Sequence, residues 1–340
     1  MDFSSQKIMQ WSRMGMRKAY GAILNELAYE HDNLVSIAAD VVDSANLMDF
    51  EMQHPDRHFN AGISEQNMVA MAAGMAKEGS NVFVTSFAPF VSLRVYEAIR
   101  TLVCYMNLNV KIVALSSGFS LGVQGATHYA LEDIAIMRAI PNLLMLSPAD
   151  TTEMAKMLEY LASYKGPAYL RLTGLPGSAT VYKEDYEYDH VGFDVIREGN
   201  DIGIFATGTL VNESIRAARV LSKNGTSVGV TNISKLNPIN RQKIISECMK
   251  YRMLFSVEEH SVVGGLGSII SETIAAVSHH PQLIRMGILD NNVIVGNYTF
   301  ILEKNNLNAK QIVERVGQEI KRYNEEYNRY EFNWNNSTSL

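Results

Sequence analysis

The sequence has few cysteines: Cys104 and Cys248 are the only two among 340 residues, and they lie far apart. Two cysteines cannot build a disulfide framework or a thiolate metal site, and their small number fits a reducing compartment. An excess of positive charge is also lacking, because 30 Lys and Arg residues stand against 36 Asp and Glu residues, for a formal charge of −6. This balance argues against a nucleic-acid-binding protein, which would carry a basic patch.

Long hydrophobic runs are absent as well. The most apolar stretch, residues 102–115, is interrupted by Asn107, Asn109 and Lys111, whereas a membrane-spanning helix needs about 20 predominantly apolar residues. The first 17 residues lack the continuous apolar segment and small-residue cleavage site of a secretory signal peptide. We therefore expect a cytoplasmic protein that does not associate with membranes.

Enough apolar material is present for a large core, because 47% of the residues are hydrophobic, 19% are charged and only 8 are proline. At about 150 residues per domain, the length predicts two domains. Short apolar runs predict buried strands, and apolar residues at helical spacing predict helices. We predict strands at 34–39, 81–85, 110–116 and 142–147, and helices at 13–31, 65–77, 91–105, 131–138 and 151–164. This alternation is typical of an α/β fold with a parallel sheet covered on both faces.

The pattern breaks over residues 175–192, which contain Gly and Pro and then a polar, acidic, Tyr-rich stretch that we interpret as a solvated linker. The α/β alternation then resumes, with strands predicted at 201–206, 227–233 and 252–257 and helices at 211–224 and 267–278. We therefore predict domains at residues 1–185 and 191–323. The polar segment 324–340 is predicted to be a flexible tail.

Ligands of open parallel sheets bind outside the carboxyl ends of the strands, and this rule ranks the polar residues of the chain. Asp40 directly follows a predicted strand, as do the Ser116-Ser117-Gly118 turn and the Ser147-Pro148 corner. These residues are better site candidates than polar residues on the faces of helices.

Four segments carry the pattern that is most informative about chemistry. Glu65 begins an otherwise apolar helix rich in Met, Ala and Gly, and Phe87 and Phe90 directly follow a predicted strand. A glycine-rich loop, Gly-Val-Gln-Gly-Ala-Thr, ends at His128. In the second domain, residues 257–268 place Glu-Glu-His before a Gly-Gly-Leu-Gly turn.

Together and in this order, these segments resemble the C-terminal half of a transketolase, over residues 12–320. The chain is similar to the smaller chain of split transketolases and, more distantly, to deoxyxylulose-phosphate synthases. The resemblance implies two parallel-type sheet domains: a thiamine pyrimidine-binding domain, followed by a smaller transketolase C-terminal domain.

The resemblance also implies thiamine diphosphate as cofactor and assigns roles to individual residues. Glu65 matches the glutamate that hydrogen-bonds the pyrimidine ring nitrogen and favours the tautomer that activates the cofactor. Phe90 matches the aromatic residue that stacks on the pyrimidine, with Phe87 beside it. Asp40 matches an acidic residue near the cationic thiazolium, and His128 matches a histidine that handles protons around the covalent intermediate.

One family motif is missing from the sequence. Thiamine enzymes bind the diphosphate through Mg²⁺, which is held by a Gly-Asp-Gly stretch and a later Asn, and no Gly-Asp-Gly occurs in this chain. Mg²⁺ requires oxygen ligands in near-octahedral array, and no such cluster is evident. We therefore expect no metal ligand in this chain. A separate partner subunit is expected to supply the Mg²⁺ site, two copies of each subunit forming an α2β2 heterotetramer with the cofactor between chains.

Departures from the family pattern bear on the substrate. Arg17 and Ser44 occupy two positions that match phosphate-binding residues of phosphosugar transketolases. Ser116 stands where the family has a phosphate-binding histidine, Gly174 where it has an arginine, and Gln124 where it has an aspartate that binds a donor hydroxyl. Losing charge-assisted contacts of about 1.5–3 kcal/mol each weakens phosphate binding considerably. We therefore expect an unusual carbonyl acceptor, unphosphorylated or nucleotide-linked, rather than a standard pentose phosphate.

Other functions fit part of the pattern. The donor could be a 2-oxo acid such as pyruvate, decarboxylated and joined to an acceptor in acyloin formation. The beta chain of a 2-oxo-acid dehydrogenase shares the domain pair, although the loop before His128 and the residues around Glu65 fit transketolase better. A non-catalytic interaction subunit is a further alternative, against which the retention of Glu65 argues, because a buried unpaired carboxyl costs several kcal/mol.

Overall fold

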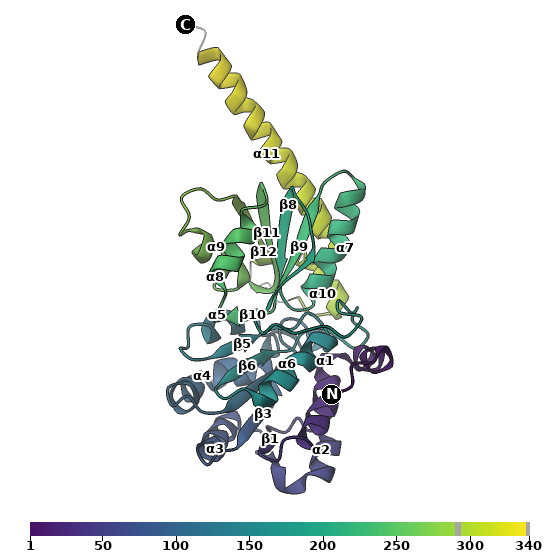
Figure 1. Ribbon diagram of the computed structural model, residues 1–340, viewed down its shortest axis with the longest axis vertical. Helices are drawn as coiled ribbons and strands as arrows, with labels where there is room; N and C mark the ends of the chain where they lie inside the picture. The colour runs from purple at the N-terminus through teal and green to yellow at the C-terminus, as the bar shows by residue number, and fades with distance from the viewer. Residues whose placement is uncertain (290–293, 338–340) are drawn as a thin grey trace.

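The computed structural model of the chain describes residues 1–289 and 294–337, with side chains described as far as residue 325. Two α/β units lie end to end along the long axis of the molecule (Figure 1). Within the described residues, no helix is long and apolar enough to cross a membrane.

The first unit is built on a seven-stranded sheet with the strand order β10-β5-β6-β4-β3-β1-β2. Its strands are β1 (Leu34–Ala38), β2 (His58–Asn60), β3 (Asn81–Phe87), β4 (Val110–Leu115), β5 (Leu144–Leu146), β6 (Ala168–Arg171) and β10 (Lys235–Asn237). Neighbouring strands pair in parallel except β10, which pairs antiparallel with β5. Since β10 comes after β7, β8 and β9 of the second unit in the chain, a segment of the second predicted domain completes the first sheet.

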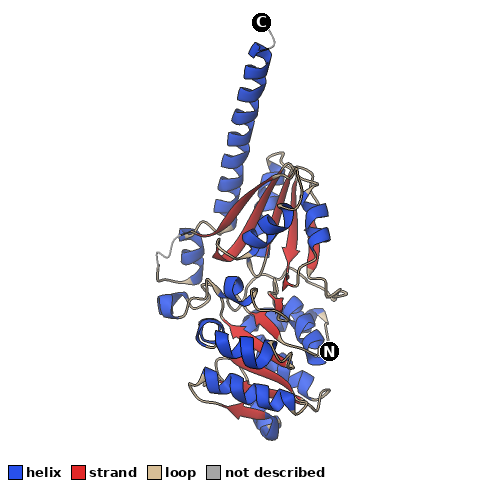
Figure 2. Ribbon diagram, turned by 90° about the vertical axis from the view of Figure 1, so that its left-hand side faces the viewer, coloured by secondary structure: helices blue, strands red, loops and turns tan. Residues whose placement is uncertain are grey.

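Helices cover both faces of this sheet (Figure 2). One face packs against α1 (Ser5–Ala28), α2 (Met48–Gln53) and α6 (Thr151–Ser163). The other face packs against α3 (Glu65–Lys77), α5 (Asp133–Met137) and a helical segment made of η2 (Phe90–Arg94), α4 (Tyr96–Ala98) and η3 (Ile99–Cys104). Two short 3₁₀ helices, η1 (Pro55–Arg57) and η4 (Gly122–Thr127), lie in the connections.

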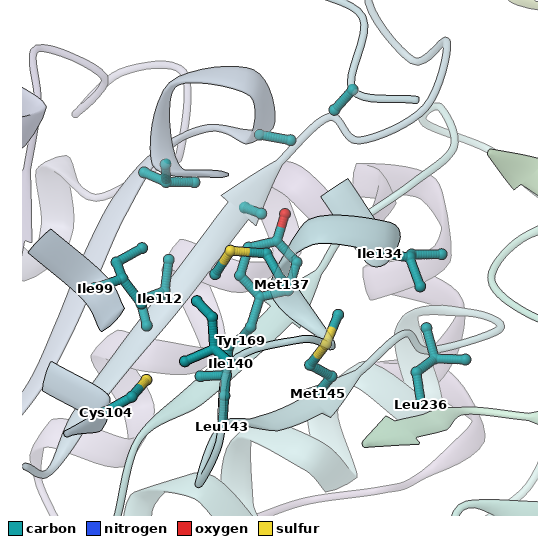
Figure 3. Close-up of a cluster of buried hydrophobic side chains, with 14 of the residues drawn as sticks. Ile99, Cys104, Ile112, Ile134, Met137, Ile140, Leu143, Met145, Tyr169 and Leu236 are labelled. Atoms are coloured by element: carbon teal, nitrogen blue, oxygen red, sulfur yellow. The ribbon is translucent and has the colours of Figure 1, made fainter. Parts of the chain in front are cut away.

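Burial on both faces explains why the central strands are apolar at nearly every position. Successive side chains of a strand point to opposite faces of the sheet. Phe83 and Val113 therefore join the cluster beneath α1 and α6, whereas Val84 and Ile112 join the cluster beneath α3. Figure 3 shows part of the second cluster, where Leu236 of β10 lies in the same core as Ile112.

The second unit contains a five-stranded sheet with the order β12-β11-β8-β9-β7. Its strands are β7 (Phe193–Arg197), β8 (Ile202–Ala206), β9 (Val228–Ile233), β11 (Met253–Ser261) and β12 (Gln282–Ile288), and only β7 pairs antiparallel. Helices α7 (Leu210–Lys223), α10 (Tyr298–Lys304) and α11 (Ala309–Ser337) form one core with the sheet. Helices α8 (Arg241–Cys248) and α9 (Leu266–Ile274) join the cluster shared with the first unit. The last turns of α11 project away from both units (Figures 1 and 2).

The predicted α/β fold with two parallel-type sheets is confirmed, and α3 has the predicted bounds. Five strands are absent from the prediction: β6, a short interior strand buried at all four positions, and β2, β7, β10 and β12, the four edge strands of the two sheets. An edge strand is only partly buried, so its sequence lacks the continuous apolar run that marks a central strand. Helix α1 begins at Ser5, well before the predicted start at residue 13.

Two segments predicted to be irregular have more structure than expected. The predicted tail at 324–340 begins inside α11, which continues as a helix to Ser337, while residues 338–340 lie outside the described part of the chain; its flexibility stays a prediction. The linker also packs against the first unit, since the backbone N–H groups of Val181 and Tyr182 donate to Asp150 Oδ2 at 2.6 and 2.8 Å. The tyrosines of this linker are half-buried rather than solvated.

A buried polar network joins the two units. Arg171 at the end of β6 donates from Nε to Asp133 Oδ2 at 2.8 Å, and Tyr169 donates to the same oxygen at 2.9 Å. Arg171 also donates from Nη2 to the backbone carbonyl of Glu259 in β11 at 2.9 Å. Tyr298 of α10 donates to Glu259 Oε2 at 2.6 Å. Burial raises the pKa of Glu259 to about 7.

Glu153 of α6 forms a second polar contact between the units. It is fully buried and accepts from the Ala149 backbone N–H at 2.6 Å and from Asn232 Nδ2 of β9 at 3.0 Å. Burial raises the pKa of Glu153 to about 8. Since this pKa is above the unfolded value of about 4.5, the protonated form stabilises the fold, and that contribution is lost as the pH rises towards 8.

We therefore expect Glu153→Gln to remove part of the pH dependence of stability. Between pH 5 and pH 8, the free energy of unfolding of the wild type should fall by up to a few kcal/mol more than that of the variant. Urea unfolding at the two pH values measures this difference. Glu184→Gln, at an exposed position, is the matched control and should follow the wild type. Equal pH dependence of Glu153→Gln and the wild type would contradict the assignment.

Candidate active site

The carboxyl ends of β1, β3 and β4 lie side by side and form one edge of the first sheet. Asp40, two residues after β1, and Ser116, directly after β4, both have a φ of 56°. Non-glycine residues in this left-handed region carry backbone strain, which is concentrated at functional sites. Two of the predicted site residues therefore lie at strained turns on this edge of the sheet.

The loop that leads into Glu65 is fixed to the same edge. Ala61 donates its backbone N–H to the Ala38 carbonyl at 2.8 Å. Asn60 Oδ1 accepts from the backbone N–H groups of Asp40 and Gly62 at 3.2 and 3.0 Å. These contacts place the first residue of α3, Glu65, next to the end of β3.

The Glu65 side chain is buried at this edge of the sheet, with 3% of the residue exposed. Ser86, near the end of β3, donates from Oγ to Glu65 Oε1 at 3.3 Å. Arg94 donates from Nη1 to Glu65 Oε2 at 2.6 Å. The position at the N-terminus of α3 adds the favourable end of the helix dipole.

Three rings pack against one another at the same edge of the sheet. Phe87 and Phe90 meet edge to face, with ring centroids 6.5 Å apart. The His128 imidazole packs against both, with its centroid 6.0 Å from that of Phe87 and 5.4 Å from that of Phe90. The structure therefore brings the predicted residues Phe87, Phe90 and His128 together, next to Ser86, which donates to the predicted residue Glu65.

Arg94 is a site residue that the sequence reasoning missed. The helical segment that contains Phe90 and Arg94 is a π-helical turn rather than the regular helix predicted for 91–105, a distortion that is frequent at functional sites. It places the Arg94 guanidinium 4.4 Å from the centroid of the Phe90 ring. The signal in the sequence was a lone cation four residues after Phe90 in an otherwise apolar segment.

The loop that carries His128 depends on a glycine. Gly125 has φ 73° and ψ −161° inside η4, a combination that essentially only glycine adopts. Its carbonyl accepts from the backbone N–H of His128 at 3.0 Å, and Thr127 Oγ1 lies 2.9 Å from His128 Nδ1. Tyr129 anchors the loop by donating to the Gly122 carbonyl at 2.8 Å.

The predicted substrate-binding residues are more dispersed. Gln124 is exposed in η4, and Ser116 is buried at the end of β4. Arg17 and Ser44 are half-buried on segments that touch each other, since Asn46 donates from Nδ2 to the Lys18 carbonyl at 3.2 Å. The structure records no contact that joins Arg17 or Ser44 to Glu65 or His128 among its described residues.

No group of three or more His, Cys, Asp or Glu side chains that could hold a metal ion occurs among residues 1–289 and 294–325. The acidic residues of the site are separate. Glu65 pairs with Arg94, and Asp40 is exposed at its strained turn.

Comparison with known proteins decides the family. A model of the transketolase pyrimidine binding domain matches residues 12–174, and a model of the transketolase C-terminal domain matches residues 192–312. The chain belongs to the transketolase family. The first unit is its pyrimidine-binding domain and the second is its C-terminal domain, so the resemblance noted in the sequence is confirmed.

Several curated relatives are subunits or sections of transketolases. A putative transketolase C-terminal section from Methanocaldococcus jannaschii is 39% identical over 91% of this chain and 97% of the relative. One of the subunits of an apulose-4-phosphate transketolase from Actinobacillus succinogenes is 34% identical over 83% of this chain and 91% of its own length. A 6-deoxy-6-sulfo-D-fructose transketolase subunit from a Clostridium species is 33% identical over 91% of this chain and 95% of its own length.

A solved structure agrees with these relatives. A split-gene transketolase, described as an inactive beta4 tetramer, superposes with a TM-score of 0.80 at 34% identity and covers 90% of this chain and 97% of its own. Together these matches show that the chain is a transferase subunit of the split, transketolase-like type.

We expect Gly125→Ala to disturb the His128 loop. A Cβ at this position would lie 3.1 Å from Val295 Cγ2, and the backbone conformation would be strained, at a cost of about 1–3 kcal/mol in the free energy of unfolding. Chemical denaturation of the purified chain measures this loss. Gly74→Ala is the control, because that glycine lies within α3 with open space around it and should gain up to about 1 kcal/mol. A Gly125→Ala variant as stable as the wild type would contradict the expectation.

Proposed function

We propose that this chain is the pyrimidine-binding subunit of a two-subunit, thiamine diphosphate-dependent enzyme that transfers a ketol or acyl-anion unit to a carbonyl acceptor. The observation that carries the proposal is the buried Glu65 carboxylate beside Phe87, Phe90 and His128 at the carboxyl edge of a parallel sheet. The alternative of a non-catalytic subunit gives no reason to assemble these four side chains.

The residues present fit the pyrimidine half of the cofactor. A buried carboxylate can hydrogen-bond a ring nitrogen, and an aromatic face beside it can stack on a flat heterocycle, which adds about 1 kcal/mol beyond area burial. When bound, thiamine diphosphate supplies a nucleophilic carbon. In this assignment Glu65 holds a proton at the ring nitrogen, Phe90 and Phe87 orient the ring, Asp40 faces the cationic half, and His128 moves protons at the substrate oxygen.

A partner subunit would bind the diphosphate through Mg²⁺. This part of the proposal is supported by the missing Gly-Asp-Gly motif, by relatives that are named as subunits of transketolases, and by the beta4 tetramer described as inactive. We infer an α2β2 heterotetramer in the cytoplasm, with each cofactor between an α and a β chain.

Calorimetric titration tests the two-subunit assignment. Thiamine diphosphate with Mg²⁺ is titrated into this chain alone, and then into the chain mixed with the subunit that carries the diphosphate-binding domain. Binding in the mixture and not to the chain alone is the expected result. Tight, Mg²⁺-dependent binding by the chain alone would overturn the assignment of the diphosphate site to a partner.

Glu65→Gln serves as the matched variant in this experiment. The amide keeps the shape of the side chain and removes the proton transfer, so turnover by the mixture should fall about 10²- to 10⁴-fold. Assembly with the partner, measured by sedimentation, should be unchanged. Full activity of the variant would exclude the role assigned to Glu65.

The substrate is proposed to differ from the standard pentose phosphates. Ser116 and Gly174 stand where charged phosphate ligands are expected, and a Cβ at Gly174 would lie 2.6 Å from Thr209 Cγ2, so an arginine does not fit this backbone. Two similar proteins are named for an apulose phosphate and a sulfosugar, which are likewise unusual transketolase substrates. Because Gln124 lacks the charge of an aspartate, a donor without a second hydroxyl, such as pyruvate in acyloin formation, is the alternative.

We expect the assembled enzyme to turn over xylulose 5-phosphate with ribose 5-phosphate poorly. These pentose phosphates would lack two charge-assisted contacts of about 1.5–3 kcal/mol each. Their kcat/KM should therefore be at least about 10²-fold lower than that of the enzyme's own donor and acceptor. A coupled assay with hydroxypyruvate and pyruvate as alternative donors distinguishes ketol transfer from acyloin formation. Efficient turnover of the pentose phosphates would overturn the substrate proposal and leave the cofactor assignment intact.

A further inference from the structure

Arg94 makes two contacts with the site, and both are with residues assigned to the cofactor pyrimidine. Its Nη1 donates to Glu65 Oε2 at 2.6 Å, and its Cζ lies 4.4 Å from the centroid of the Phe90 ring. A guanidinium is planar, carries N–H donors at its edge and stacks well on an aromatic face. Arg94 therefore hydrogen-bonds Glu65 and lies over the Phe90 ring, the two groups that are assigned to the pyrimidine.

We propose that Arg94 is an internal competitor of the cofactor: its guanidinium binds the Glu65 carboxylate and the Phe90 ring, and it must swing away before the thiamine pyrimidine can bind. This inference rests on the proposed function, because Glu65 and Phe90 are pyrimidine ligands only there. It adds that the site is gated by a residue of this chain.

The position of Arg94 allows such a movement. Its side chain is 46% exposed, whereas that of Glu65 is 3% exposed, so Arg94 can rotate into solvent while Glu65 stays in place. Among the described residues, Glu65 is the single hydrogen-bond and ion-pair partner recorded for the guanidinium. The backbone of the turn is held independently, since Ser92 donates from Oγ to the Ala88 carbonyl at 2.6 Å.

The ion pair also has a role when the pyrimidine is not bound. Without Arg94, the recorded side-chain contact of the Glu65 carboxylate is the longer hydrogen bond from Ser86, at 3.3 Å. A buried carboxylate without a charged partner destabilises a fold. Arg94 thus stabilises the site before the pyrimidine binds. It also weakens pyrimidine binding, because the pyrimidine can bind only to the fraction of molecules in which Arg94 is displaced.

The competing possibility is that Arg94 remains in place and positions Glu65 or contacts the cofactor directly. The two roles predict opposite signs for one measurement. A competitor weakens cofactor binding, so its removal tightens binding. A positioning residue strengthens cofactor binding, so its removal weakens it.

The experiment compares Arg94→Ala with the wild type in the complex with the diphosphate-binding subunit. Calorimetry with thiamine diphosphate and Mg²⁺ should give a Kd about three- to tenfold lower for Arg94→Ala, the range expected when a partly exposed ion pair no longer competes. Thermal unfolding of the variant chain alone should show a Tm about 1–4 °C lower, because Glu65 loses its ion pair. The two measured quantities are the Kd of the cofactor and the Tm of the chain, and neither requires catalytic turnover.

Two further variants keep the result interpretable. Arg100→Ala removes another exposed arginine of the same helical segment and should leave both Kd and Tm unchanged. Arg94→Lys retains the charge and loses the planar fork, so its Kd should lie between those of the wild type and Arg94→Ala.

Each outcome decides one question. A Kd that is unchanged or higher in Arg94→Ala, with binding intact in the wild type, overturns the competitor role while the proposed function stands. Failure of the wild-type complex and of all three variants to bind the cofactor overturns the proposed function, and the competitor role with it. A lower Kd in both Arg94→Ala and Arg100→Ala would assign the effect to net charge and also overturn the inference.

Discussion

The buried ion pair between Arg171 and Asp133 fixes three parts of the molecule relative to one another. These are the first sheet, the loop that carries His128 and the second domain. Arg171 ends the strand next to β4, Asp133 begins α5, and the same guanidinium reaches the backbone carbonyls of Ala130 and Glu259. One side chain therefore binds the first sheet, the end of the His128 loop and the central strand β11 of the other domain. Removing one member of such a pair costs about 3–5 kcal/mol, because the other is left as a buried charge.

These contacts of Arg171 explain how a site formed by the first domain can depend on the second domain. The loop from Gly118 to Ala130 begins and ends at a bridge between those two residues. Glu259 Oε1 accepts from the Phe119 backbone N–H at 2.5 Å, just inside that bridge. A Cβ on Gly118 would lie 2.3 Å from the same carboxylate oxygen. The C-terminal domain thus holds the base of the loop that places His128, two residues before Ala130, against Phe90.

Much of the fold and part of the site could be predicted from the sequence. Longer central strands such as β4 are apolar on both faces and are identified by their continuous apolar run. The four edge strands and the short strand β6, which ends in Arg171, carry a weaker signal. Glu65, Phe87, Phe90 and His128 were predicted through a family resemblance, and the structure places them together. Arg94 was missed because a regular helix over 91–105 gave no reason to turn it towards Glu65. In the structure, Arg94 ends the π-helical turn at 90–94, which the regular helical spacing of this segment did not predict.

The antiparallel strand β10 also constrains how the chain can be synthesised and divided. It lies between β9 and α8 in sequence, yet it forms the outer edge of the first sheet beside β5. During translation, the first sheet stays incomplete until the ribosome has passed residue 237, when β7, β8 and β9 have already been made. A fragment ending in the linker near residue 190 would expose the N–H and C=O groups of β5 as an open edge, which is a template for aggregation. The two family domains are therefore separable in sequence comparison, whereas the sheet of the first domain takes its last strand from the segment assigned to the second.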